Sequence, residues 1–301
     1  MLERIKRKLR SGAMDYLQRS SGNLRDSIDL ANYARNSLLP LPPVVTDEQQ
    51  WLPASKLGLT GIDLREADQL ERIGQWKSEK YQRTFAKLRG NSDINTERVG
   101  QTSLTNGWYN TPDAEIYAAM ILDRQPRRIV EVGAGFSTRI ARATASEAGL
   151  QTRITVVDPQ PRTEIQNIAD EVILKPVEKS GLTEREWSSG DLLFVDSSHI
   201  CRTRGDVPYL FCELIPRLPA GVLVHVHDIY LPFDYPNNLD PRCYTEQYML
   251  HSLLSHAPRY RTLITSHWLS RTHPDRMREA FGHEVARDVR LYGGCYWFEI
   301  V

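Results

Sequence analysis

The sequence predicts a doubly wound α/β fold, in which helices cover both faces of a mainly parallel sheet. Seven short segments rich in β-branched and other apolar residues follow one another between residues 129 and 301, and helical patterns separate the first five. The turn Gly133-Ala134-Gly135 comes directly after the first segment, as it does at the edge where such sheets bind ligands. Acidic residues stand at or near the ends of four segments: Glu131, Asp158, Asp196 and Asp228.

Composition limits the broad class of the protein. With 301 residues, of which 41% are hydrophobic and 25% charged, the chain can form one large globular domain or one domain with an appendage. Lys plus Arg and Asp plus Glu number 38 each, so no overall charge predicts a nucleic-acid partner. Four scattered cysteines, without a C-x-x-C pair, predict reduced thiols and a cytoplasmic location. The longest apolar run, residues 116–122, is too short for a transmembrane helix, and the chain has no signal-peptide pattern.

Residues 1–100 are predicted to form a mainly helical extension that acts as a lid, a dimerisation arm or a scaffold, which leaves a homo-oligomer open. Three apolar residues share one helical face within the basic segment 1–11. This pattern permits a peripheral membrane contact, but it buries little area, so a solvated helix is the favoured interpretation. The Pro-rich segment 39–43 ends the first helical stretch, and a second is expected from about 65 to 88.

The elements of the second predicted domain, residues 101–301, follow in order. Its first helix should begin after Thr111, a good N-cap, with Pro112 in the first helical position. Strands are expected at 129–132, 154–157, 171–174, 191–195, 221–226, 260–265 and 295–301. Helices are expected at 112–124, from Ser137 or Thr138 as the N-cap to Ala148, and at 163–169, 183–187, 207–218 and 246–254.

The glycine turn is the first candidate ligand site, because it leads into a helix start, where backbone N–H groups point at a ligand. A dinucleotide fingerprint requires a third glycine three residues after the second, but Thr138 stands there. Glu131, two residues before Gly133, would repel a pyrophosphate and attract a cationic amino group. Asp158 ends the next strand, 27 residues after Glu131, where a carboxylate can accept both ribose hydroxyls. The pattern therefore favours a ligand with a ribose and a cationic amino group.

An acid-x-Gly-x-Gly turn, followed by an acid at the end of the next strand, resembles the class I S-adenosylmethionine-dependent methyltransferases. The resemblance implies a seven-stranded, Rossmann-like sheet with an antiparallel last strand, and S-adenosylmethionine as the cofactor. It places the amino group at Glu131, the ribose at Asp158 and the adenine near Val177. The implied cofactor-binding residues are Glu131, Gly133, Gly135, Phe136, Ser137, Thr138, Asp158, Pro159, Val177, Asp196 and Ser197.

Asp196 and Asp228, at the ends of the fourth and fifth strands, are similar to the acids of metal-dependent O-methyltransferases. These include the catechol type and those acting on sugars of macrolides and aminocoumarins, in which the fifth-strand pair is usually Asp-Asp or Asp-Asn. Here the pair is His227-Asp228. The resemblance implies Mg²⁺ or Mn²⁺ held by Asp196, Asp228 and His227, because carboxylate oxygens suit such cations. His199, His227 and Asp196 are the implied catalytic residues, with a histidine as the general base.

A longer set of motifs resembles a bacterial methyltransferase family of the Methyltransf_24 kind. The motifs extend over residues 106–301 and are DAEIYAAMI, RRIVEVGAGFST, GDLLFVDSSHI, GVLVHVHDIYLPFDYP and YGGCYWFEI. The resemblance implies methylation of a hydroxyl group on a sugar, a glycan or a secondary metabolite. Aromatic residues in the loop before residue 112 and in the insertion at 229–242 are the candidate acceptor contacts: Trp108, Tyr109, Tyr230, Phe233 and Tyr235.

Other interpretations of the same residues stay open. A metal-free methyltransferase would use His199 or His227 as its base, and a non-catalytic protein of the same fold would serve as a binding or assembly subunit. A dehydrogenase is disfavoured by Glu131 and by the missing third glycine. His225 lies inside a predicted strand and is interpreted as a packed or hydrogen-bonded residue. The remaining histidines are interpreted as surface or packing residues: His251, His256, His267, His273 and His283.

Overall fold

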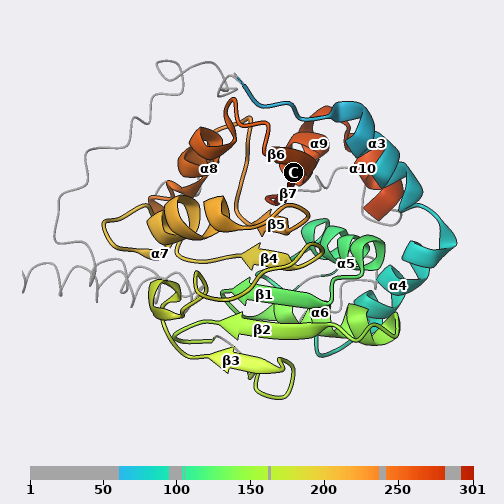
Figure 1. The fold of residues 1–301 in the computed structure, drawn as a ribbon. Helices are drawn as coiled ribbons and strands as arrows, with labels where there is room; N and C mark the ends of the chain where they lie inside the picture. The colour runs from blue at the N-terminus through green and yellow to red at the C-terminus, as the bar shows by residue number, and fades with distance from the viewer. Residues whose placement is uncertain (1–60, 95–103, 105, 162–163, 237–241, 282–292) are drawn as a thin grey trace, which may run out of the picture.

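A computed structural model describes residues 61–94, 104, 106–161, 164–236, 242–281 and 293–301 (Figure 1). The expectations for the basic segment 1–11 and for the Pro-rich segment 39–43 lie outside these residues. Within them, no helix is both long and apolar enough to cross a bilayer.

A single seven-stranded sheet has the strand order β3-β2-β1-β4-β5-β7-β6. Strands β1 to β5 pair in parallel, whereas β7 is antiparallel to both β5 and β6. This order confirms the predicted doubly wound class, including its antiparallel last strand. The strands are β1 Arg128–Val132, β2 Arg153–Val157, β3 Glu171–Ile173, β4 Leu192–Val195, β5 Leu223–Val226, β6 Tyr260–Thr265 and β7 Tyr296–Ile300.

The strand order reverses at β1, because β2 and β3 lie on one side of it while β4 and β5 lie on the other. Connections from β1 and β4 therefore leave the sheet in opposite directions. In doubly wound sheets this arrangement opens a crevice at the carboxyl ends of the strands, and ligands bind there. The glycine turn after β1 and the acids after β4 and β5 all lie at this edge.

Helices and short helical turns connect the strands (Figure 1). The α-helices are α3 Glu66–Gln75, α4 Glu79–Gly90, α5 Asp113–Arg124, α6 Phe136–Glu147, α7 Asp206–Pro208, α8 Glu246–Leu254, α9 Ser266–Thr272 and α10 Pro274–Phe281. The 3-10 segments are η2 Val177–Lys179 and η4 Ile215–Arg217, and η3 Tyr209–Leu214 is a π-helix. The helix expected at 207–218 is thus α7, η3 and η4 in succession.

Several helix predictions were wrong. The helix expected at 65–88 is divided into α3 and α4, and residues 164–169 and 183–187 form turns and bends instead of helices. Segments this short form too few hydrogen bonds to offset the cost of starting a helix. Thr111 is not the N-cap of α5, because Pro112 takes that position, and the Thr111 hydroxyl donates to Glu115 Oε1 at 2.8 Å.

Helix α5 is buried along most of its length because it packs on the sheet on one side and contacts α4 and α6. Its Tyr117 ring lies 4.7 Å from the Phe194 ring of β4 and 5.8 Å from the Trp297 ring of β7. The apolar character all round the helix follows from this double burial. The packing also fixes the start of α5, with Asp113, near the carboxyl edge of the sheet.

The described part of the N-terminal extension, residues 61–94, packs against the C-terminal part of the chain. In Figure 1, α3 lies beside α9 and α10, although about 200 residues separate them in the sequence. Gln69 of α3 is fully buried and accepts the backbone N–H of Thr265 at 2.8 Å. The Trp76 and Phe281 rings lie 6.0 Å apart. These contacts attach this part of the extension to the C-terminal elements, and its predicted role as a lid, a dimerisation arm or a scaffold stays a prediction.

Candidate active site

The turn after β1 contains two glycines with different physical requirements. Gly133 has a φ of +92°, and a Cβ there would lie 2.0 Å from the carbonyl oxygen of Asp196, so the fold itself demands glycine. At Gly135, a Cβ would meet no atom of the described residues within 4 Å. Protein packing therefore leaves the space beside Gly135 open, at the edge where a cofactor is expected. Gly133, by contrast, brings the end of β1 against the end of β4.

Asp158 connects the end of β2 to the glycine turn. Its Oδ2 accepts the backbone N–H of Ala134 at 2.9 Å, and its Oδ1 accepts the N–H of Gln160 at 2.7 Å. Each oxygen of an ionised carboxylate can accept a second hydrogen bond. The two backbone bonds thus orient Asp158, and its contact with ribose hydroxyls stays a prediction.

The helix after the turn begins differently from the prediction. Helix α6 starts at Phe136 with Gly135 as its N-cap, so neither Ser137 nor Thr138 takes that position. The hydroxyl of Thr138 reaches back from inside the first turn and accepts the N–H of Gly135 at 3.2 Å. Ser137 and Thr138 are both buried. The Thr138 hydroxyl therefore stabilises the turn, and the predicted contact of Ser137 and Thr138 with a cofactor is untested.

Glu131 is fully buried beside the turn. Its Oε1 accepts the Tyr117 hydroxyl at 3.0 Å, whereas its Oε2 is enclosed and has no hydrogen-bond partner among the described residues. Burial raises the pKa of Glu131 to about 7, although the hydroxyls of Thr138 and Tyr117 oppose the rise. A nearby ammonium group would compensate this oxygen electrostatically. The orphaned oxygen and the open space at Gly135 together fit S-adenosylmethionine.

The other predicted cofactor residues lie after strands at the same edge. Val177 is buried at the start of η2, after β3. Pro159 is exposed after β2, and Ser197 is half-buried after β4. Their contacts with a cofactor stay predictions.

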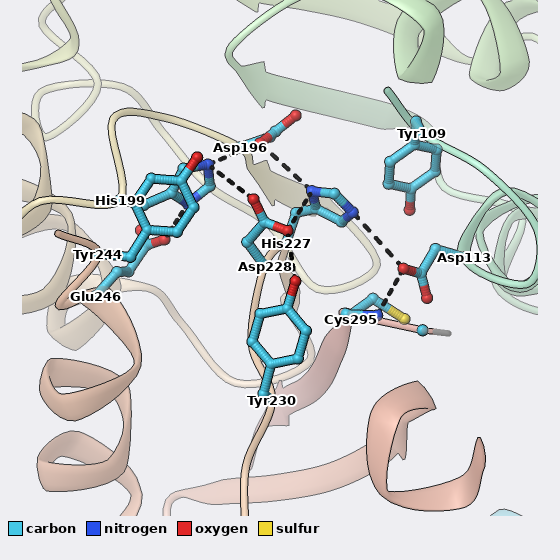
Figure 2. A network of polar contacts seen from close by, with 12 residues as sticks. Tyr109, Asp113, Asp196, His199, His227, Asp228, Tyr230, Tyr244, Glu246 and Cys295 are labelled. Carbon is cyan, nitrogen blue, oxygen red and sulfur yellow. Dashed lines mark hydrogen bonds and ion pairs between the residues drawn. The ribbon is translucent and has the colours of Figure 1, made fainter. Parts of the chain in front are cut away.

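Four predicted residues meet at the carboxyl ends of β4 and β5 (Figure 2). Asp196 and His199 follow β4, and His227 and Asp228 follow β5. Oδ1 of Asp196 lies 3.1 Å from His199 Nε2 and 3.5 Å from His227 Nδ1, so one carboxylate joins both imidazoles. Oδ2 of Asp228 lies 3.7 Å from His199 Nε2. The structure thus brings these side chains together, and their catalytic roles stay predictions.

Backbone strain accompanies the cluster. His199 and Asp228 both have left-handed backbone conformations, with φ of +61° and +54°. Such conformations cost roughly 1–3 kcal/mol and persist only where surrounding contacts impose them. At His199 the contacts are visible, because its carbonyl accepts the N–H groups of Thr245 at 2.8 Å and Glu246 at 3.1 Å. Strain of this kind is typical of functional sites.

Two further acids, Glu246 and Asp113, belong to the network and were missed in the sequence. Oε2 of Glu246, at the start of α8, lies 2.8 Å from His199 Nδ1. Oδ2 of Asp113, at the start of α5, lies 3.6 Å from His227 Nε2 and accepts the N–H of Gly294 at 2.7 Å. Both acids are far in sequence from the histidines they contact. The one sequence feature that could have indicated Asp113 is its place as the first residue of the DAEIYAAMI motif.

The network favours charged histidines. Burial disfavours the charge on His199, but the phenol of Tyr244 and two neighbouring carboxylates raise its pKa well above the usual value. Burial also opposes the charge on His227, but Asp228 and further carboxylates raise its pKa well above the usual value. Against the effect of burial, the two imidazoles hold the pKa of Asp196 well below its usual range. The network therefore favours an ionised Asp196 carboxylate and shifts both imidazoles toward their protonated forms.

The residues predicted to hold Mg²⁺ or Mn²⁺ do not fit a divalent cation. Nδ1 of His227 lies 3.5 Å from Asp196 Oδ1, and its Nε2 lies 3.6 Å from Asp113 Oδ2. Burial opposes the charge on this ring, but the neighbouring carboxylates raise its pKa well above the usual value, which disfavours the neutral ring that a metal ligand requires. In the part of the chain that the structure describes, no three His, Cys, Asp or Glu side chains converge as metal ligands. The predicted set of Asp196, Asp228 and His227 is thus not supported as a metal site.

The aromatic residues predicted to contact an acceptor have different surroundings. The Tyr230 hydroxyl donates to Asp228 Oδ1 at 3.1 Å, which places this ring at the cluster (Figure 2). Tyr109 is buried, with its ring 4.9 Å from the His227 ring and its hydroxyl 3.2 Å from His225 Nε2. It therefore supports His227 from inside the core, and the half-buried Trp108 is the more accessible member of that loop.

The short segment between the insertion and α8 contributes one aromatic residue, Tyr244, that was not selected from the sequence. The Tyr244 ring lies 4.5 Å from the His199 ring and 5.9 Å from the Tyr235 ring. Tyr235 itself accepts the N–H of Gln247, and Phe233 is buried. Tyr244 and Tyr230 thus contact the polar cluster, as Tyr109 does from inside the core. Residues 237–241 of the insertion lie outside the described residues.

The comparison with protein families decides the class. Residues 130–229, from β1 to the turn after Asp228, match the family model Methyltransf_24, which is described as a methyltransferase domain. Residues 130–229 are thus similar to the methyltransferase domain of this family. The chain is accordingly an S-adenosylmethionine-dependent methyltransferase, and the matched segment holds the glycine turn together with Asp196, His199 and His227. No curated protein matches the chain.

Solved structures are similar to the chain at low identity. Podospora anserina methyltransferase PaMTH1, solved with SAH bound, has 14% identity and a TM-score of 0.40, covering 88% of this chain and 99% of its own. A putative O-methyltransferase from Klebsiella pneumoniae has 14% identity and a TM-score of 0.40, and cofactor-bound Rv0187 from MTB has 13% and 0.39. Each of these two comparisons covers 74% of this chain and 90% of the other. The fold assignment for the methyltransferase domain rests on its strand order.

Proposed function

We propose that this methyltransferase transfers a methyl group to a hydroxyl oxygen of a sugar, a glycan or a secondary metabolite, and that it does so without a metal ion. The observation that carries the proposal is the carboxylate–imidazole cluster beside the glycine turn. The backbone of Asp196 packs against Gly133, so the cluster shares a wall with the expected cofactor site. An acceptor held at the cluster would be close to the methyl group.

His199 is the proposed general base. S-adenosylmethionine, when bound, supplies an electrophilic methyl group on a sulfonium centre. Nδ1 of His199 is occupied by Glu246, so the acceptor hydroxyl gives its proton to Nε2. The carboxylates of Asp196 and Asp228 surround that nitrogen and can accept hydrogen bonds from acceptor hydroxyls. Such positioning can supply about 7–11 kcal/mol of the barrier.

His227 has a different proposed role. Its two ring nitrogens face the carboxylates of Asp196 at 3.5 Å and Asp113 at 3.6 Å, and both carboxylates favour the charged ring, so His227 is proposed to keep its proton. Its raised pKa keeps a positive charge close to the acceptor site across neutral pH. A fixed charge of this sign stabilises the negative charge that develops on the acceptor oxygen. The imidazolium would thus supply the charge that the sequence analysis assigned to a cation.

The surroundings of the cluster support a neutral, hydroxylated acceptor. Tyr230 and Tyr244 offer apolar ring faces next to carboxylates that accept hydroxyl protons. Carboxylates would repel an anionic acceptor. A cytoplasmic location remains part of the proposal, because Cys201 and Cys212 are exposed free thiols, as expected in a reducing compartment. A homo-oligomer and a peripheral membrane contact through residues 1–11 remain untested predictions.

The direct test measures transfer of a labelled methyl group from S-adenosylmethionine to a panel of hydroxylated sugars and phenols, with EDTA present. A labelled methyl ether is the expected product. If the protein binds S-adenosylhomocysteine (SAH) but methylates none of the acceptors, the binding-subunit interpretation replaces the proposal. If transfer occurs only after Mg²⁺ is added, the metal-free mechanism is wrong.

A further inference from the structure

We infer that Glu246 is a positioning residue, which holds His199 in the orientation and tautomer that direct Nε2 toward the acceptor. The inference rests on the proposed function, because it assigns a purpose to Glu246 within that site. Glu246 itself is not proposed to touch the cofactor or the acceptor. It acts only through His199.

Three contacts join the start of α8 to His199. Oε2 of Glu246 lies 2.8 Å from His199 Nδ1, and the backbone N–H groups of Thr245 and Glu246 both donate to the His199 carbonyl. The same residue thus contacts the imidazole with its side chain and the backbone with its amide. This double attachment fixes both the strained φ of His199 and the rotation of its ring.

The two ring nitrogens of His199 face opposite sides of the site (Figure 2). Nδ1 points to Glu246 at the start of α8, whereas Nε2 points to Asp196 and Asp228 at the sheet edge. When the ring is neutral, a carboxylate that holds the proton on Nδ1 leaves a lone pair on Nε2, and an acceptor hydroxyl that binds there displaces the 3.1 Å contact with Asp196 Oδ1. The Tyr244 ring, 4.5 Å away, packs on the imidazole and restricts its movement.

The burial of the Glu246 carboxylate costs hydration free energy unless a cationic partner compensates its charge. Its side chain is fully buried, and its Oε1 has no hydrogen-bond partner among the described residues. A buried carboxylate loses its hydration, and a charged partner offsets that loss. His199 is the partner that the structure provides, and the ring becomes a cation when it takes the acceptor proton. Glu246 therefore stabilises the protonated form of the base at the moment of transfer.

The first experiment compares Glu246→Gln with a matched control, Glu115→Gln. Glu115 is also fully buried, but it contacts Arg89 and Thr111, away from the cluster. We expect Glu246→Gln to lower kcat at least about tenfold and to leave KM for both substrates within about threefold, because only orientation and charge at the base change. The acidic limb of its pH–rate profile should move to lower pH, because the variant removes one of the carboxylates that raise the pKa of His199. The groups that remain around the ring are Asp196, Asp228 and Tyr244. Glu115→Gln should change neither kcat nor the limb.

The outcome that overturns the inference is an unchanged kcat in Glu246→Gln. A fall in kcat that is matched by a loss of SAH affinity and thermal stability, with the pH limb in place, would also overturn it, because it would show a structural role only.

A second experiment does not depend on turnover. NMR of ¹⁵N-histidine-labelled protein with SAH bound reports which nitrogen of His199 carries the proton, with His199→Gln used for assignment. The inference is supported if the neutral His199 ring carries its proton on Nδ1 in the wild type and no longer does so in Glu246→Gln. This result counts even if no acceptor is methylated. Methyl transfer by a wild-type protein whose neutral His199 is protonated at Nε2 would refute it while leaving the proposed function in place.

Discussion

The glycine turn and the polar network lie at the same edge of one sheet, but they are assembled in different ways. The turn consists of residues close in sequence, and its shape follows from the positive φ of Gly133 and the backbone bonds of Asp158. The network joins strand ends to two distant helix starts, at Asp113 and Glu246. A local motif can therefore indicate the cofactor, whereas the choice of base and charge partner depends on the whole fold. Variants in each region test this contrast.

The largest effect is expected from His199→Gln, which removes the proposed base. Loss of a general base typically lowers kcat by about 10²–10⁴-fold. Because the pKa of His199 is raised, its neutral form grows only above the usual histidine range, so the wild-type rate should still rise with pH near neutrality. Steady-state kinetics across pH should show this rise in the wild type and its absence in His199→Gln. A variant with more than half of the wild-type kcat would remove His199 from the mechanism.

Next in size is the stability difference between the two glycine variants. In Gly133→Ala the new Cβ would lie 2.0 Å from the Asp196 carbonyl oxygen at a φ of +92°, which should lower the free energy of unfolding by roughly 2–4 kcal/mol. In Gly135→Ala the free energy should change by less than about 1 kcal/mol, while SAH binding weakens, because the methyl group occupies the open space. Chemical denaturation and SAH titration measure the two quantities. Equal stabilities would show that Gly133 is not required by packing.

Glu131→Gln should change stability and cofactor binding in opposite directions. The pKa of Glu131 rises on folding from its usual 4.5 to about 7, so its ionisation opposes folding, and stability is lost as pH rises through that interval. The variant should therefore be more stable than the wild type at pH 8, by about 2–3 kcal/mol, but bind SAH more weakly.

The same titration predicts a pH dependence of binding. The wild type should bind SAH up to about tenfold more tightly at pH 8 than at pH 6, because the carboxylate is ionised above its pKa and attracts the amino group. Glu131→Gln should show no such change. An unaltered pH dependence in the variant would mean that Glu131 does not act on the cofactor.

The smallest effect is expected from metal removal. EDTA should leave turnover within about twofold of the untreated value, because His227 supplies the positive charge beside Asp196. Added Mg²⁺ or Mn²⁺ should not stimulate the enzyme. Loss of activity with EDTA, restored by Mg²⁺, would show that the imidazole network rearranges around a cation.

The sequence was sufficient for the parts of the molecule that short-range physics determines. Strand ends were predicted to within two residues, because runs such as Ile129–Val132 are buried on both faces and apolar throughout. Short helices at 163–169 and 183–187 failed, because their stability depends on tertiary contacts that no local pattern contains. The Mg²⁺ prediction is not supported for a related reason, since the partners of His227 could not be known before Asp113 was placed.

The candidate site shows the same division. Asp196, His199, His227 and Asp228 could be selected because each follows a predicted strand, where ligand sites are expected. Glu246 and Tyr244 could not, because only the packing of α8 on the loop after β4 brings them to His199.

The central claim is that the open glycine turn binds S-adenosylmethionine, and calorimetric titration with SAH tests it most directly. NAD serves as the control ligand, and each titration is run with and without Mg²⁺. We predict saturable SAH binding in the micromolar range, independent of Mg²⁺, and no binding of NAD. Absence of SAH binding by the folded protein, or binding of NAD in its place, would contradict the account.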